Sequence, residues 1–231
     1  MSFLDYTVIR IETFGEYNRV VLLGERRNAF SRQLIERLSG VDCDKDLVIT
    51  NEGPVFSAGL DLAVFLQSKD AVLEYLFSVH RLVKRFISCG GRVVVHVSGD
   101  VYGFGVEFLY FVDYVVAQRE NIKFSLQGVN FGVFPPYTIA IGRRLFSHGH
   151  LRVVLSREFD AKEASHFGIV SQIGQLELEK LFKPPPYLLG FVRPRHWLGA
   201  VVDDAVPYLY KLAEVGTREE TRGRIRKFLG R

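Results

Sequence analysis

The sequence of 231 residues has little or none of several features, and each absence excludes a class of protein. Its only two cysteines, Cys43 and Cys89, are not closely spaced and carry no metal-ligand pattern, so we expect neither a disulfide framework nor a zinc site. No run of about 18 uncharged apolar residues occurs, and acidic residues interrupt the N-terminal stretch where the apolar part of a signal peptide would lie. We therefore expect a protein of the reducing cytoplasm with no membrane partner.

The motifs of common phosphate-binding and hydrolytic enzymes are also missing. GxxxxGK[ST] is absent, and GDVYGFG at 99–105 does not match GxGxxG, which argues against P-loop hydrolases and Rossmann enzymes. GxSxG is absent, so Ser57 and Ser98 lack the flanking pattern of a nucleophile elbow. His80 and His96 have no second ligand at metal spacing. We accordingly expect no metal site.

The chain has enough apolar residues for a large core and a mild excess of basic ones. Hydrophobic residues make up 48% of the sequence, which favours a folded domain over a disordered chain. The formal net charge is +4, and the basic residues are spread along the chain. A basic balance favours anionic partners such as nucleotides, phosphorylated cofactors or RNA. Because the excess is small and dispersed, we do not expect nucleic acid as the main partner.

Apolar periodicity predicts an α/β chain. Alternation and buried apolar runs predict strands at 6–12, 18–23, 47–50, 92–97 and 114–117, the first two joined by a turn at Gly15. Helical spacing predicts helices over 31–40 and 70–89, and further helices over 200–215 and 217–229. Prolines and glycines at 183–190 indicate a break. We place a boundary near residue 175, between a core at 1–175 and a helical segment at 176–231 that packs on the core or on a neighbouring subunit.

Two segments share the order of a buried strand, small residues and a helix start: LVITNEGPVFSAGLDL (47–62) and VVVHVSGDVYGFGVEF (93–108). Backbone N–H groups at helix starts have no intrahelical partner and carry the positive end of the helix dipole. They can therefore bind an anion or a developing oxyanion. The small residues let a ligand approach the backbone closely.

Glu107 is an ionisable residue in an apolar stretch, next to Val106 and Phe108. A buried carboxylate is costly unless it is neutral or hydrogen-bonded, so Glu107 is either structurally paired or used in chemistry. Burial is expected to raise its pKa, which suits a group that exchanges protons near neutral pH.

Five segments together resemble the motifs of a known family. They are RRNAF (26–30), FSAGLDL (56–62), VSGDVYGFGVEFLYFVDYVVA (97–117), NFGVFPP (130–136) and FDAKEASHFGIVSQI (159–173). In this order they resemble the enoyl-CoA hydratase/isomerase, or crotonase, family over residues 6 to about 175. The resemblance implies an α/β fold built as a spiral of ββα units with a C-terminal helical segment. It also implies an acyl-CoA thioester as ligand and assembly into trimers or paired trimers.

The resemblance assigns roles to individual residues. The N–H groups of Leu60 and Phe104 would receive the thioester oxygen, and Glu107 would activate the water that adds to Cβ of an enoyl thioester. The position of the family's second catalytic glutamate, which serves the proton at Cα, holds Gly128. Further residues implied to contact the substrate are Arg27, Ala58, Asp61, Leu62, Gly103, Gly105 and Gly128. No separate cofactor is implied, because coenzyme A is part of the substrate.

The sequence departs from the family pattern at two positions, and this leaves alternatives open. At Gly128 a water, Tyr137 or Asn130 could replace the missing glutamate, or the reaction could be isomerisation, thioester hydrolysis or decarboxylation. A non-catalytic acyl-CoA-binding or RNA-binding protein is the alternative of another class. At Phe104 the family usually has glycine or alanine, so the ring must be accommodated beside the site.

Other residues near these motifs allow a structural interpretation beside the functional one. We expect Asp61 and Asp113 to be caps or strand-end hydrogen-bond partners. Arg26 and Arg27 could bind CoA phosphates or form a solvated loop pair. The aromatic residues Phe108, Tyr110 and Phe111 would be core residues, some of them lining an acyl tunnel.

Overall fold

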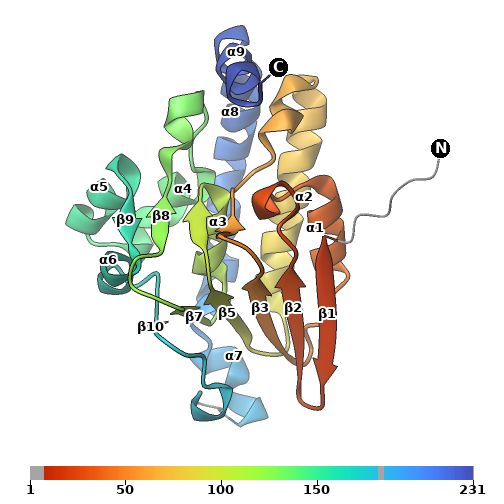
Figure 1. Cartoon of the computed structure of the whole chain (residues 1–231), viewed down its shortest axis with the longest axis vertical. Helices are drawn as coiled ribbons and strands as arrows, with labels where there is room; N and C mark the ends of the chain where they lie inside the picture. The colour runs from red at the N-terminus through yellow and green to blue at the C-terminus, as the bar shows by residue number, and fades with distance from the viewer. Residues whose placement is uncertain (1–7, 182–184, 231) are drawn as a thin grey trace, which may run out of the picture.

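The computed structural model describes residues 8–181 and 185–230, and the strands of this part form two sheets (Figure 1). The first sheet contains β1 (Ile9–Phe14), β2 (Tyr17–Leu22), β3 (Asp46–Asn51), β5 (Val93–Val97), β7 (Tyr114–Ala117) and β10 (Gln172–Ile173), in this order. The second contains β4 (Val55–Ser57), β6 (Asp100–Tyr102), β8 (Lys123–Ser125) and β9 (Phe159–Asp160). All neighbouring strands are parallel except the antiparallel pairs β1–β2 and β8–β9.

The helices surround these sheets, with α8 and α9 above them and α7 below them in the view of Figure 1. The α-helices are α1 (Arg32–Ser39), α2 (Lys69–Ser88), α3 (Phe104–Phe108), α4 (Pro136–Leu145), α5 (His148–Ser156), α6 (Ala161–His166), α7 (Leu189–Val192), α8 (Val206–Gly216) and α9 (Glu219–Phe228). Short 3-10 helices are η1 (Glu25–Asn28), η2 (Leu62–Leu66), η3 (Leu109–Phe111), η4 (Gln127–Phe131), η5 (Leu178–Lys180), η6 (Pro186–Leu188), η7 (Pro194–Ala200) and η8 (Val202–Ala205). No helix in the described ranges is long and apolar enough to cross a membrane.

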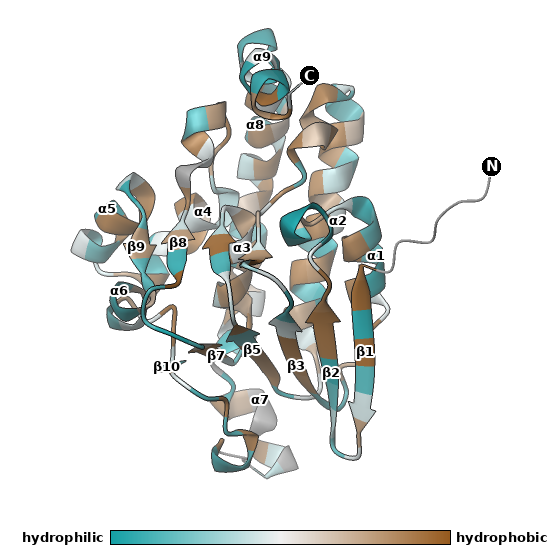
Figure 2. Ribbon diagram, in the orientation of Figure 1, coloured by the Kyte–Doolittle hydropathy of each residue, from teal (hydrophilic) through white to brown (hydrophobic). Residues whose placement is uncertain are grey.

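Most elements predicted from periodicity are confirmed. The strand predicted at 6–12 is observed as β1 from Ile9, and residues 6 and 7 lie outside the described residues. The helix predicted over 200–215 is α-helical only from Val206, after the 3-10 helix η8. The hairpin of β1 and β2 turns at residues 15 and 16, and the side chain of Ser31 caps α1 by accepting a hydrogen bond from Leu34 N at 3.2 Å. Strands β3 and β5 pair in parallel and are buried along most of their length, which explains their largely apolar sequences. Figure 2 shows this apolar character in β3, in contrast to the largely hydrophilic α9. The α/β architecture is therefore confirmed.

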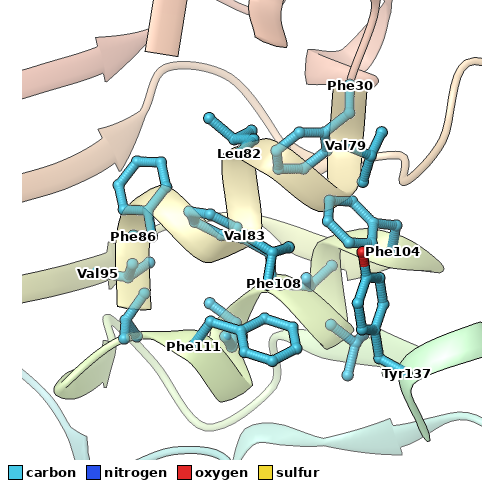
Figure 3. Close-up of a cluster of buried hydrophobic side chains, with 14 of the residues drawn as sticks. Phe30, Val79, Leu82, Val83, Phe86, Val95, Phe104, Phe108, Phe111 and Tyr137 are labelled. Carbon is cyan, nitrogen blue, oxygen red and sulfur yellow. The ribbon is translucent and has the colours of Figure 1, made fainter. Parts of the chain in front are cut away.

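Helix α2 organises the core. It begins after Ser68, whose side chain accepts a hydrogen bond from Ala71 N, and it packs against α1 and α8. Its buried residues recur at helical spacing: Val72, Tyr75, Leu76, Val79, Leu82, Val83 and Phe86. They meet the aromatic side chains of α3 and α4 in one continuous core, part of which is drawn in Figure 3.

Cys43 and Cys89 form a disulfide across 46 residues of sequence, so the expectation that the cysteines are unpaired is wrong. Cys43 precedes β3 and Cys89 precedes β5. Because β3 and β5 are parallel neighbours, the segments that enter them start side by side. Spacing along the sequence does not report such a contact. The disulfide also removes the argument from cysteine usage for a reducing compartment.

Two buried arginines attach the C-terminal segment to the same region. Arg193 Nη1 donates to Cys89 O at 3.0 Å and to Gly91 O at 2.8 Å. Arg195 Nη2 donates to the same two carbonyls at 2.7 and 2.8 Å, and its guanidinium forms an ion pair with Asp113. The end of α2 thereby obtains partners for carbonyl groups that its own helix leaves unpaired.

Candidate active site

Two turns meet at the same edge of the four-stranded sheet, one after β4 and one after β6. These strands are parallel neighbours, so the chain leaves both in the same direction. Gly59 in the first turn has a φ of +87°, and a Cβ built there would lie 2.8 Å from Tyr102 O and 2.9 Å from Phe104 N. Only a residue without a side chain permits both this backbone conformation and this approach. Gly103, with a φ of +53°, provides the opposite side of the contact.

The amides of Leu60 and Phe104 are left without internal partners by this arrangement. Within residues 8–181 and 185–230, neither N–H donates a hydrogen bond. The peptide groups beside them are fixed, since Gly59 O accepts from Phe30 N and Gly103 N donates to Ser125 O, both at 2.8 Å. Phe104 is the first residue of α3, where an unpaired N–H is inherent to the helix. Two unpaired donors on touching turns are suited to hold one oxyanion.

Ser57 holds the first turn in place, a role that the sequence analysis did not identify. It is fully buried, and its Oγ donates to Asn28 O at 2.9 Å while accepting from Gly59 N at 3.1 Å. A Cβ on Gly105 would lie 2.8 Å from Ser57 Cβ, so α3 sits directly against this serine. The sequence gives no signal of this role, because Ser57 does not belong to a motif that marks a functional serine.

Glu107 lies one turn along α3 from Phe104, and only 1% of its surface is exposed. Its Oε1 accepts two hydrogen bonds from Thr138 at the start of α4, from the backbone N at 2.7 Å and from Oγ1 at 3.0 Å. Tyr110 extends this set, because its hydroxyl lies 3.2 Å from Thr138 Oγ1. Thr138 also went unrecognised in the sequence, although the preceding Pro136 does indicate a helix start there.

The environment of Glu107 changes the pKa of its carboxyl. Burial raises its pKa to about 8, and the hydrogen bonds from Thr138 oppose that increase without cancelling it. The carboxyl can therefore both accept and return a proton close to neutral pH. The expectation of a raised pKa is confirmed.

Gly128, in η4, leaves no room for a larger residue without rearrangement. A Cβ there would lie 3.1 Å from Val133 Cγ2 and 3.4 Å from Val133 O. Of the two side chains considered as substitutes, Tyr137 is engaged elsewhere, because its hydroxyl lies 3.1 Å from His80 Nδ1. The Nε2 atom of His80 in turn lies 2.9 Å from Asp203 Oδ1. Asn130 is exposed.

Asp61 and Asp113 have the structural roles expected of them. Asp61 caps η2, since its Oδ1 accepts from Ala63 N at 3.0 Å, and it also pairs with Arg26 at 3.1 Å. Asp113 is a strand-end partner, accepting from Val93 N at 2.8 Å.

The remaining predicted residues surround the two turns. Arg27 is exposed, and its carbonyl accepts from Ala58 N at 2.9 Å. Leu62 begins η2, directly after the capping residue. Phe108 and Phe111 belong to the buried core, as predicted. The contacts of Arg27, Ala58 and Leu62 with a substrate stay predictions.

Comparison with known proteins identifies relatives over most of the chain. The model of the family described as Enoyl-CoA hydratase/isomerase matches residues 20–180. A curated relative, Enoyl-CoA hydratase domain-containing protein 3, mitochondrial, of Danio rerio, is 29% identical over 174 residues. The match covers 70% of this chain and 60% of that protein, so the chain spans less than two thirds of its relative's length.

Solved structures extend the likeness to nearly the whole fold. The enoyl-CoA hydratase from Bacillus halodurans has a TM-score of 0.81 at 16% identity, covering 96% of this chain and 100% of that one. An enoyl-CoA hydratase from Mycobacterium avium has a TM-score of 0.77 at 21% identity, covering 96% of each chain. At these identities the likeness establishes the fold, and the crotonase-type α/β architecture expected from the sequence is confirmed.

Proposed function

Because the chain belongs to the enoyl-CoA hydratase/isomerase family, we propose that it is an acyl-CoA enzyme that adds water to a 2-enoyl-CoA thioester. One observation carries the proposal. Gly59 packs against Phe104 N, which places the unpaired amides of Leu60 and Phe104 on touching turns, with Glu107 one helical turn away. The names of the relatives support the substrate class.

In this proposal the thioester oxygen lies between the N–H groups of Leu60 and Phe104. Negative charge grows on that oxygen as the enoyl group becomes an enolate. The hydrogen bonds from both N–H groups become stronger as this charge grows. Each such donor is worth about 3 kcal/mol in other oxyanion holes. Because the donors are backbone groups held by neighbouring hydrogen bonds, they need little reorganisation when the charge appears.

Glu107 is the proposed general base. Its carboxylate takes a proton from a water molecule while the water oxygen bonds to Cβ, and the π electrons of the double bond move toward the thioester oxygen. The enolate then collapses and Cα takes a proton. With Gly128 offering no side chain and the Tyr137 hydroxyl bonded to His80, we assign this proton to the newly protonated Glu107. One carboxyl would thus serve both steps.

The absent second carboxyl favours one other candidate, thioester hydrolysis at the same pair of amides. This reaction also develops an oxyanion, but it needs no proton donor at Cα. Release of the free CoA thiol distinguishes it from hydration, in which the thioester stays intact.

Substrate binding and assembly complete the proposal. The exposed Arg27 would contact CoA phosphates beside the turn that Ala58 begins. Self-association into trimers or paired trimers follows from the family resemblance and is measured by sedimentation.

The test is the loss of enoyl absorbance of crotonyl-CoA with and without the protein, followed by Glu107→Gln. We expect Glu107→Gln to reduce kcat by about 100-fold or more, in the range typical of a lost general base. The matched control is Glu163→Gln, which changes an acid paired with Arg157 on the surface. An equal rate for Glu107→Gln and the wild type removes Glu107 from the mechanism.

A further inference from the structure

The geometry points to Phe104 as a specificity residue whose ring restricts the proposed hydratase reaction to short acyl chains. The inference rests on the proposed function and deepens it by naming the substrate class. The inference concerns the side chain of Phe104, the residue whose backbone N–H is one of the two proposed hydrogen-bond donors. The family resemblance gives no reason for a ring at this position, because glycine or alanine is usual there.

Phe104 and Glu107 lie three residues apart on α3, so their side chains project from the same face of that helix. This face is directed at the start of α4, where Thr138 binds Glu107 and Tyr137 contacts Phe104. The ring of Phe104 is therefore a neighbour of the proposed base. Figure 3 shows it between Phe30 on one side and Tyr137 on the other.

The ring is held on several sides. Its centroid lies 4.7 Å from that of Phe30 in an edge-to-face arrangement and 5.8 Å from that of Tyr137. Only 3% of Phe104 is exposed, and Tyr137 is fully buried. Tyr137 is itself fixed by Phe111 at 5.2 Å between ring centroids and by the hydrogen bond to His80. Moving the Phe104 ring away would therefore disturb a packed core.

The proposed substrate pose directs the acyl chain toward this cluster. With the thioester oxygen on the amides of Leu60 and Phe104 and Cβ beside the carboxyl of Glu107, the chain runs along the same face of α3. A crotonyl group ends one carbon beyond Cβ. A longer chain has to enter the space that the rings of Phe104 and Tyr137 occupy.

The experiment compares kcat/KM for crotonyl-, 2-hexenoyl-, 2-octenoyl- and 2-decenoyl-CoA. We expect the wild type to favour crotonyl-CoA over 2-decenoyl-CoA by about tenfold or more. In Phe104→Ala, the acyl chain can enter the space that the ring vacates. Each methylene that does so should raise kcat/KM, relative to that for crotonyl-CoA, about fourfold. Phe104→Leu keeps the core largely filled and should give an intermediate ratio.

Phe86→Leu is the matched control. It shortens a buried aromatic residue of the same cluster that contacts Phe108, on the side of the view away from Phe104 and Tyr137 (Figure 3). Its chain-length ratio should equal that of the wild type. The inference is overturned if the wild type hydrates all four substrates equally well, or if Phe104→Leu and a folded Phe104→Ala keep the wild-type ratio. Absence of turnover with every substrate refutes the proposed function instead.

Discussion

Replacing Glu107 by Gln should change the pH dependence of stability, whatever the reaction. The carboxyl has an ordinary pKa of 4.5 and a pKa of about 8 in the folded chain, because it is buried. Between these values the folded chain holds one proton more than the unfolded chain. The contribution of Glu107 is therefore fully present below pH 4.5 and is lost as the pH rises through about 8.

The size of the effect follows from the two pKa values. Their difference corresponds to about 5 kcal/mol, at about 1.4 kcal/mol for each pH unit. Glutamine has nearly the same shape, does not titrate, and can still accept both hydrogen bonds from Thr138 through its amide oxygen. Relative to the wild type, Glu107→Gln should therefore gain about 4 kcal/mol of stability between pH 5 and pH 9, because part of the total is already lost at pH 5.

Urea unfolding followed by circular dichroism at intervals of pH measures this difference, with equal m-values as the check that both chains unfold alike. Any pH-independent cost of burying the new amide cancels, because the comparison uses only the change of the unfolding free energy with pH. Glu163→Gln is the control: the Arg157 guanidinium lowers the pKa of Glu163, so that pair contributes equally throughout this pH range. Parallel stability curves for Glu107→Gln and the wild type would show that Glu107 titrates as an ordinary surface acid and refute the reasoning.

Two further predictions concern the turns and the disulfide. Gly59→Ala should abolish turnover and lower the melting temperature, whereas Gly53→Ala should only lower the melting temperature. Both glycines have positive φ, +87° and +81°, but only a Cβ at Gly59 meets Phe104 N; equal activity of the two variants would contradict a role for that contact. Reducing the disulfide should lower the free energy of unfolding by about 4 kcal/mol, the loop-closure value for 46 residues. Urea unfolding with and without reductant measures this, and identical midpoints would exclude it.

The sequence predicts most of the larger elements because their signals are local. The alternation of β1 and the 3.6-residue spacing of α2 are visible within one stretch of chain. Strands β4, β6, β8 and β9 are only two or three residues long, too short for any period to appear. They exist because neighbouring strands supply their hydrogen bonds, and that pairing is set by the whole fold.

The candidate site likewise combines features that have a local sequence signal with contacts that have none. Glycines between a strand and a helix indicate the two turns, and the apolar neighbours of Glu107 indicate its raised pKa. The contacts that complete the site join distant segments. Thr138 reaches Glu107 across 31 residues, and Arg195 reaches Cys89 across 106. No local pattern encodes such a contact, which depends on the order of strands in the sheets.

The two departures from the family pattern differ in their physical consequences. At Phe104 the proposed donor is the backbone N–H, which every residue except proline provides, so a ring changes the volume beside the site and leaves the donor unchanged. At Gly128 the missing group is a carboxyl, which no backbone atom replaces. A carboxylate whose pKa is raised to about 8 is a stronger base toward water than an ordinary glutamate, and once it is protonated it becomes the proton donor that the proposed reaction assigns to Cα. The buried position of Glu107 therefore favours the first proton transfer in the proposed reaction, and with Gly128 offering no second carboxyl the same group is assigned the return of the proton.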